Sequence, residues 1–156
     1  MDAVRSHAPG FIFTTSLPPP IAAAASASIN HLMASDHERR EQRRAVQATK
    51  RALLDIGIPV LHNDTHIIPV IVGDAENCKK LSDYLCDVHD IYVQPINYPT
   101  VRRGQERLRI TPTPLHLDEH ICHLAKALQD AYVHFGLPLG ACSPVVGSSQ
   151  ISASGG

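Results

Sequence analysis

The sequence predicts an α+β fold, with helices on one face of a small, mainly antiparallel sheet. Length and composition suit one soluble globular domain, because the chain has 156 residues of which 44% are hydrophobic and 19% charged. Hydrophobic periodicity indicates two helices followed by a β-α-β-β-α pattern. That order is typical of α+β domains and not of doubly wound sheets.

Charge and cysteine usage argue against several classes of protein. The formal net charge is −1 with His neutral, which gives no electrostatic case for nucleic acid or an anionic membrane as a partner. No apolar run reaches the roughly 18 residues of a membrane-spanning helix. The four cysteines lack C-x-x-C spacing, and we expect reduced thiols with structural or incidental roles: Cys78, Cys86, Cys122 and Cys142.

The first third of the chain predicts a strand and two helices. Residues Gly10 to Thr15 are apolar and β-prone, which is typical of a strand. Three prolines follow, and proline is tolerated in the first turn of a helix, so a helix is expected from about Pro20 to Met33. Ser35 and Asp36 provide an N-cap for a second helix, from about Asp36 to Ile56, which Gly57 ends in the left-handed conformation.

The middle of the chain predicts the sheet. The clearest strand is His66 to Gly73, and Pro69 within it indicates an edge or a bulge. Asp74 caps a helix to about Val88, with an apolar stripe at helical spacing. Two further strands are expected, over Ile91–Gln94 and Arg107–Thr111, separated by a polar loop.

The last helix is expected to begin at Leu117 and Asp118. Four apolar residues form one stripe along it: Ile121, Leu124, Leu128 and Tyr132. Residues 139–156 are rich in Ser and Gly without periodicity, so we expect a disordered tail.

Two segments can bind an anion. Arg107, Arg109 and Thr111 share one face of their strand, and an arginine on a strand can present a bidentate fork to a carboxylate. The alternative is that both arginines are ordinary surface residues that bind no ligand. Hydroxyls at Thr14 and Thr15, beside a helix start, can also donate to an anion, although an ordinary strand end would look the same.

A third candidate is a histidine cluster at the start of the last helix. His116, His120 and His123 are spaced so that all three can face one way. The H-E-x-x-H order is missing, so metal binding is the weaker interpretation and surface histidines the stronger one.

Three passages resemble the 5-aminolevulinate synthases, members of the α-oxoamine synthase family within the class-II pyridoxal-phosphate-dependent aminotransferase superfamily. Residues 5–19 resemble the segment that follows the cofactor lysine. Residues 66–70 resemble the strand that opens the C-terminal domain. Residues 91–114, beginning I-Y-V-Q-P-I-N-Y-P-T-V, resemble the most distinctive signature of the family. The likeness covers about residues 1 to 138.

The resemblance implies the C-terminal part of a fold-type-I pyridoxal 5'-phosphate homodimer. It implies an acyltransferase that condenses glycine with succinyl-CoA to 5-aminolevulinate, CoA and CO2, the first step of haem and tetrapyrrole biosynthesis. Residues 1–34 would end the large domain with a strand and an interdomain helix. Residues 35–138 would form the small α+β domain.

The resemblance also assigns roles residue by residue. Thr14 and Thr15 match positions that reach across the dimer to the cofactor phosphate of the partner subunit. Thr100 matches a position that contacts substrate, and Arg109 matches the arginine that holds the glycine carboxylate. Arg102 departs from the pattern, because the family usually has a proline there, and it places a flexible cation in a loop that normally closes over the active site.

The cofactor lysine of the family is expected upstream of Met1. None of the chain's own lysines matches its context: Lys50, Lys79, Lys80 and Lys126. We therefore expect no catalytic residue in this chain and no turnover by the chain alone. We also expect apolar surface to be exposed between Phe11 and Ala27, where the large domain would pack.

Two other functions are consistent with the residues. A non-catalytic binding or regulatory module could reuse the small domain of an α-oxoamine synthase, and a zinc-binding helical protein could use the three histidines. Enzymes of the resembling family work in the mitochondrial matrix or the bacterial cytoplasm, and the sequence fits either.

Overall fold

The computed structural model describes residues 2–7 and 17–140, and its contacts divide the chain into two units, residues 1–38 and 39–156. The first unit contains helices α1 (Asp2–His7) and α3 (Pro19–Ala34). Helix α3 confirms the helix predicted over 20–33. Helix α1 was not predicted, because six residues are too short to show a period. The strand predicted over Gly10–Thr15 lies outside the described residues.

Helix α3 has no buried residue. Its large apolar side chains are open to solvent, with Ile21 56% and Met33 81% exposed. Most of the stability of helices in proteins comes from packing an apolar face against other elements, and α3 has no such buried face. The exposed apolar surface expected up to Ala27 is therefore present over the described residues of that stretch.

Helix α4 (His37–Asp55) confirms the second predicted helix. The Ser35 hydroxyl accepts from the His37 N–H at 3.3 Å and donates to the Glu38 carboxylate at 2.7 Å. Hydrogen bonds from His31 and then from Ser35 lower the pKa of Glu38 to about 2. The helix is followed by Gly57 at φ +77°, where a Cβ would lie 2.7 Å from the carbonyl oxygen of Gly140, so the left-handed conformation and the close approach both require glycine.

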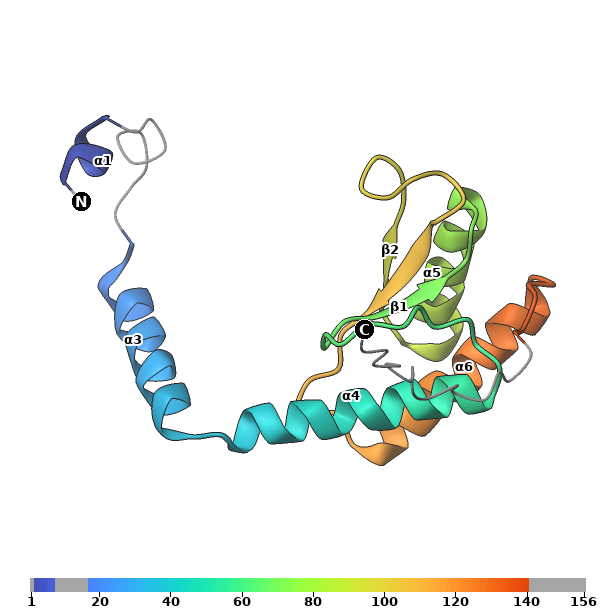
Figure 1. The fold of residues 1–156 in the computed structure, drawn as a ribbon, viewed down its shortest axis with the longest axis horizontal. Coiled ribbons are helices and arrows are strands. Elements are labelled where there is room, and N and C mark those ends of the chain that lie inside the picture. Colours follow the sequence, from blue (N-terminus) through green and yellow to red (C-terminus); the bar gives the residue numbers. More distant parts are fainter. Residues whose placement is uncertain (1, 8–16, 141–156) are drawn as a thin grey trace, which may run out of the picture. The chain divides into compact units, whose positions relative to one another are not determined.

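The sheet has three strands, β1 (Ile68–Ile71), β2 (Gln94–Ile96) and β3 (Arg107–Ile110), in the order β1-β3-β2 (Figure 1). Both pairs are antiparallel, so the predicted α+β class with an antiparallel sheet is confirmed. Strand β1 lies at an edge, as Pro69 indicated. The Pro69 carbonyl accepts from the Leu61 N–H at 2.9 Å, so its peptide edge faces away from β3 and the missing N–H removes no bond to that strand.

The second strand was predicted three residues too early, over Ile91–Gln94. The backbone of that segment instead forms hydrogen bonds with helix α5 (Ala75–His89). The Ile91 N–H donates to the Leu85 carbonyl at 2.9 Å, and the Val93 carbonyl accepts from the Ser82 hydroxyl at 2.6 Å. Groups bound to a helix cannot also pair in a sheet, so the strand begins at Gln94.

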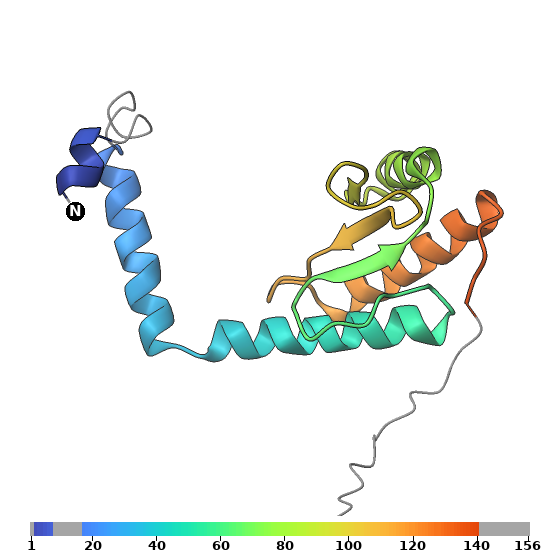
Figure 2. The ribbon, with the colours of Figure 1, turned by 45° about the horizontal axis from the view of Figure 1, so that its top comes forward.

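Helices α5 and α6 (Asp118–His134) cover one face of the sheet, and α4 runs beside α6 (Figures 1 and 2). An ion pair of 2.8 Å between Arg44 and Asp118 joins α4 to the start of α6. The core between these layers contains fully buried side chains from α4, from strands β1 and β3 and from both covering helices: Leu53, Ile68, Val70, Leu81, Leu85, Leu108 and Leu128.

The caps and stripes of the two covering helices mostly follow the prediction. The Asp74 carboxylate accepts from the Asn77 N–H at 2.8 Å, which is the predicted N-cap of α5. The stripe predicted along α6 faces the core. Val88 is an exception, being 56% exposed, because it lies in the last turn of α5 beyond the final core residue, Leu85. Within the described ranges, no helix combines the length and the apolar character needed to cross a membrane.

Candidate active site

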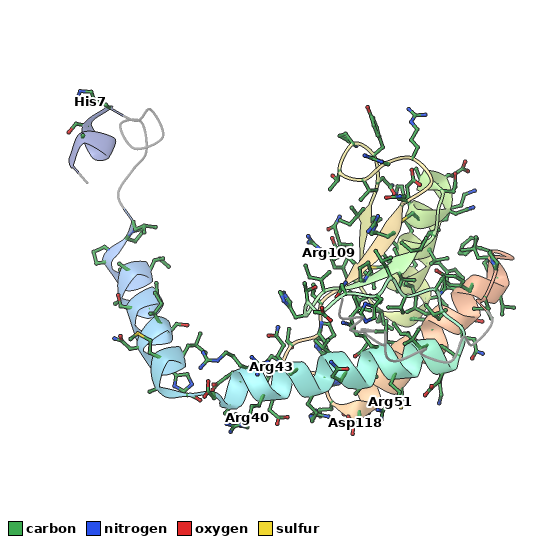
Figure 3. All side chains as sticks on the ribbon, in the orientation of Figure 1. His7, Arg40, Arg43, Arg51, Arg109 and Asp118 are labelled. Carbon is green, nitrogen blue, oxygen red and sulfur yellow. The ribbon has the colours of Figure 1, made fainter. Side chains whose placement is uncertain are left out.

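Arg109 occupies the centre of the sheet. It lies in β3 opposite Pro69 of β1 and Gln94 of β2, so strands on both sides hold its backbone. Its neighbours Leu108 and Ile110 are buried, while Arg109 is exposed on the side of the sheet away from α5 (Figure 3). The predicted alternation of faces along this strand is therefore confirmed.

The Arg109 guanidinium makes no hydrogen bond or ion pair with any residue that the structure describes. Arg107, the other arginine on the same face, differs, because its Nε donates to the Gln105 carbonyl at 2.9 Å. The Arg107 side chain therefore already has a hydrogen-bond partner in the loop before β3, whereas the Arg109 guanidinium has none among the described residues. An unpaired planar fork on a rigid strand is suited to two-point contact with a carboxylate.

Thr100 lies in the loop between β2 and β3. Its N–H donates to the Asn97 carbonyl at 3.0 Å, which closes a turn that leaves the Thr100 side chain exposed. The Asn97 side chain donates to the Ala75 carbonyl at 3.3 Å, so the first turn of α5 anchors this end of the loop. Arg103 stacks its guanidinium 5.2 Å from the centre of the Tyr98 ring.

Glu106 anchors the other end of the loop, a role that the sequence analysis missed. Its side chain is buried, with the residue only 3% exposed, and its carboxylate accepts from the Gly104 N–H at 2.8 Å. Its carbonyl accepts from Val72 and Gly73, at 2.9 and 3.0 Å. A lone acidic residue beside a strand carries no sequence pattern that separates a buried anchor from a solvated charge.

Arg102 lies in the same loop. Its carbonyl accepts from the Gln105 N–H at 3.0 Å, while its side chain is exposed and has no partner among the described residues. The turn therefore uses only the Arg102 backbone, which is why a residue other than proline can stand there.

A cavity of about 600 Å³ opens beside Arg109. The segment that follows α5, strands β2 and β3, the segment between β3 and α6, and the first half of α6 form its wall. The lining includes the cationic or imidazole side chains of Arg109, His116 and His120. It also includes the amide of Gln94, the hydroxyl of Tyr92 and the apolar side chain of Leu115. Thr100 is not among the lining residues, so the structure gives Arg109 and Thr100 no common pocket.

The three histidines do not form a metal site. The His116 ring accepts from the Thr113 N–H at 2.8 Å, and the His120 ring accepts from the Leu117 N–H at 3.0 Å. His123 lies 2.9 Å from the His89 carbonyl. Across the described residues, no three His, Cys, Asp or Glu side chains are placed to hold a metal ion.

Among the described residues, no cysteine or lysine lines this cavity. Cys78 is buried, and burial raises the pKa of its thiol to about 11. Cys86 and Cys122 are free and exposed, and Cys142 lies outside the described residues. Three lysines have partners elsewhere, because Lys50 donates to the Asn63 carbonyl at 2.7 Å and the other two pair with carboxylates at 2.6 Å, as Lys79–Asp83 and Lys80–Glu76. Thr14 and Thr15 also lie outside the described residues.

Comparison with known proteins identifies the family. The model of the class I and II aminotransferases matches residues 1–128. The chain belongs to the class I and II aminotransferase family. Within it, the chain is 55% identical over 139 residues to the 5-aminolevulinate synthase of Bradyrhizobium diazoefficiens, covering 89% of this chain and 34% of that protein. It is 54% identical over 138 residues to the mitochondrial 5-aminolevulinate synthase of Schizosaccharomyces pombe, covering 88% of this chain and 25% of that protein.

Solved structures of the family have the same fold. A serine palmitoyltransferase from Sphingomonas wittichii matches with a TM-score of 0.77 at 26% identity, over 88% of this chain and 35% of that one. A structure of SPT with PLP matches with a TM-score of 0.78 at 27% identity, over 88% and 35%. The predicted fold, a small α+β domain of a fold-type-I enzyme, is confirmed. The chain spans about a third or less of the length of the curated relatives named above.

Proposed function

We propose that this chain is the C-terminal portion of a 5-aminolevulinate synthase. Such an enzyme is a pyridoxal-phosphate-dependent acyltransferase that condenses glycine with succinyl-CoA to 5-aminolevulinate, CoA and CO2. The identity to the Bradyrhizobium and Schizosaccharomyces enzymes supports this proposal. In a eukaryote the enzyme would work in the mitochondrial matrix, and in a bacterium it would work in the cytoplasm.

One observation carries the proposal at the level of chemistry: Arg109 is exposed on the central strand, and its guanidinium has no partner in the described part of the chain. A bidentate contact from this fork would hold the glycine carboxylate in one orientation. Fixing the carboxylate fixes the direction of the Cα–H bond that must break, which is a positioning contribution to catalysis. The cofactor, when bound, withdraws electrons from that carbon.

The described residues fit the substrate half of such a site. The Arg109 guanidinium has no partner among the described residues, and Thr100 is exposed on a loop held at Asn97 and Glu106. We propose that Thr100 contacts substrate. Thr14 and Thr15 would donate to the cofactor phosphate across the interface of a homodimer.

The chain by itself is proposed to be inactive. None of the four lysines lines the cavity beside Arg109, and three of them have partners elsewhere, while Lys126 is exposed on α6. Incubating the purified chain with pyridoxal phosphate and then borohydride should label no single lysine. A stoichiometric adduct at one defined lysine would contradict this part of the proposal.

The catalytic proposal is tested on the chain within its full reading frame. Release of CoA from succinyl-CoA should require glycine and pyridoxal phosphate and should yield 5-aminolevulinate. Use of serine or alanine with equal efficiency would indicate another member of the family. Absence of product from a folded protein that still binds its ligands would favour the binding-module alternative.

A further inference from the structure

The outer face of helix α4 carries a row of arginines. Arg40, Arg43 and Arg51 are all exposed, and their positions along the helix can be followed in Figure 3. At about 100° per residue, the three fall within about 80° of one another around the helix axis. The row is about 17 Å long, because each residue from 40 to 51 advances the helix by about 1.5 Å. Thr49 and Leu53, which are buried in the core, face away from it.

The three guanidinium groups of this row make no hydrogen bond or ion pair with any residue that the structure describes. Arg44, on the same helix, differs from them. Its side chain pairs with Glu41 at 3.0 Å and with Asp118 at 2.8 Å. The arginine row is therefore a set of positive charges that the domain itself leaves uncompensated, and not a general property of the arginines of α4.

The carboxylates of α4 do not neutralise the row. The Glu38 carboxylate accepts from the Ser35 hydroxyl at 2.7 Å and lies 2.7 Å from the His31 ring, and Glu41 is paired with Arg44. Asp55 is exposed four residues after Arg51, and these two side chains form no ion pair within the described part of the chain. An external carboxylate would thus meet little competition from the helix itself.

The surroundings of the row favour a protein partner over nucleic acid or a membrane. Helix α4 contains no Phe, Tyr or Trp on which a base could stack, and the whole chain has a formal net charge of −1. Its apolar face is buried in the core, so it cannot insert into a lipid surface as an amphipathic helix does. Leu54, 44% exposed, falls within the same sector of the helix as the arginines and offers one apolar contact.

We infer that this face of α4 binds an acidic helix of another protein, whose carboxylates lie in one row at the spacing of the arginines. Two helices that lie side by side have the same rise per residue, so carboxylates at helical spacing meet the guanidinium groups along the whole row. Each exposed ion pair is weak, and binding depends on several acting together. The inference goes beyond the proposed function and does not rest on it, since no arginine of the row lines the cavity beside Arg109.

The probe is a pair of synthetic helical peptides of identical composition. One carries glutamates at positions i, i+4, i+7 and i+11, in a single row, and the other distributes the same glutamates around the helix. Binding to the 156-residue chain is followed by amide NMR shifts at low ionic strength. The row peptide should bind at least roughly tenfold more tightly, with shifts confined to α4, and should weaken as salt is added. Equal affinities of the two peptides, no saturable binding, or shifts outside α4 would overturn the inference.

Substitution by glutamine tests the arginines one at a time. Glutamine and arginine have similar helix propensities, so the urea midpoint should stay unchanged. Arg40→Gln, Arg43→Gln and Arg51→Gln should each weaken binding of the row peptide roughly threefold, and the triple variant roughly twentyfold or more. Arg102→Gln is the matched control, because it removes the same charge from an exposed side chain in the loop between β2 and β3. An equal effect of Arg102→Gln would reduce the result to net charge and overturn the inference.

Two other polyanions provide the competing outcomes. A single-stranded oligonucleotide and phosphatidylglycerol vesicles are titrated under the same conditions as the row peptide. Both should bind more weakly than the row peptide and should be insensitive to the arginine substitutions. Tighter binding of either one, weakened by the same substitutions, would overturn the acidic helix in favour of that class of partner.

The same titration is repeated on the full-length protein. The affinity for the row peptide should stay within roughly threefold of that of the 156-residue chain. Its loss there would show that the upstream part of the protein covers α4, and would overturn the inference of an external partner. Turnover is measured separately by glycine-dependent release of CoA, so a failure of either proposal is distinguishable from a failure of the other.

Discussion

Strand β3 and the loop that precedes it hold the two residues proposed to contact substrate, Arg109 and Thr100, in different ways. Arg109 is fixed by backbone pairing on both sides, to Pro69 and to Gln94. Thr100 lies in a loop whose ends are held by Asn97 on the Ala75 carbonyl and by Glu106 on the Gly104 N–H, and its own N–H donates within the turn to the Asn97 carbonyl. Arg109 is thus supported by the sheet, whereas Thr100 is supported by hydrogen bonds of its loop that can be removed one at a time.

The largest effect is expected from removing the support beneath Arg109. Leu108 is fully buried next to it. Leu108→Ala should lower the free energy of unfolding by about 3 kcal/mol, because the lost side chain leaves a cavity in the core. Urea unfolding measures this. Thr111→Ala, on the exposed face of the same segment, should change the stability by less than about 0.5 kcal/mol, and similar losses in both variants would contradict the rigid support.

The next effect concerns the loop alone. Glu106→Ala leaves the Gly104 N–H without its acceptor, at a cost of about 1–3 kcal/mol. Hydrogen exchange of the Gly104 amide should accelerate, while the amides of β3 keep their protection. Glu106→Gln retains an acceptor and should restore most of that protection. Equal acceleration throughout the sheet would show that Glu106 supports the whole domain and not the loop.

A smaller effect is expected at the other anchor of the loop. Asp74 caps the helix whose first residue, Ala75, accepts from Asn97. Asp74→Ala should cost about 1 kcal/mol in thermal or urea unfolding and should loosen the Asn97 contact. Asp74→Asn keeps a side-chain acceptor and should cost less. Equal stabilities of the two variants would show that the Asp74 side chain does not stabilise the protein as an N-cap.

The smallest effect is expected at Arg102. Its side chain has no described partner, and its carbonyl alone serves the turn. Arg102→Pro should therefore be tolerated and should stabilise the folded state by up to about 1 kcal/mol, by restricting the unfolded chain. Slower exchange confined to residues 98–105 is the expected readout. A loss of stability would mean that the Arg102 N–H or side chain has a role in the loop.

Sequence reasoning predicted the elements that depend on local periodicity. The helices after Pro18, Ser35, Asp74 and Leu117 all begin within two residues of their predicted starts. The exposed position of Arg109 followed from alternation alone. These features were predictable because capping and strand alternation involve neighbours in the sequence.

Features that depend on distant contacts were not predictable. Ile91 and Val93 have the composition of a strand, yet Leu85 and Ser82 of α5 occupy their backbone groups. Glu106 is buried, and its carbonyl accepts from Val72 and Gly73, contacts that no local pattern records. The contacts of the His116 and His120 rings with the backbone likewise appear only in the folded chain. The roles of Thr14, Thr15, Thr100 and Arg109 remain predictions.

The most direct test of the account compares the two arginines of β3 in the full-length protein. Lysine keeps the charge but lacks the planar fork. Arg109→Lys should raise the KM for glycine by at least roughly tenfold, whereas Arg107→Lys, whose parent side chain already binds Gln105, should leave it nearly unchanged. Equal effects of the two substitutions on that KM, or none at Arg109, would contradict the proposal that the unpaired guanidinium on the central strand holds the substrate carboxylate.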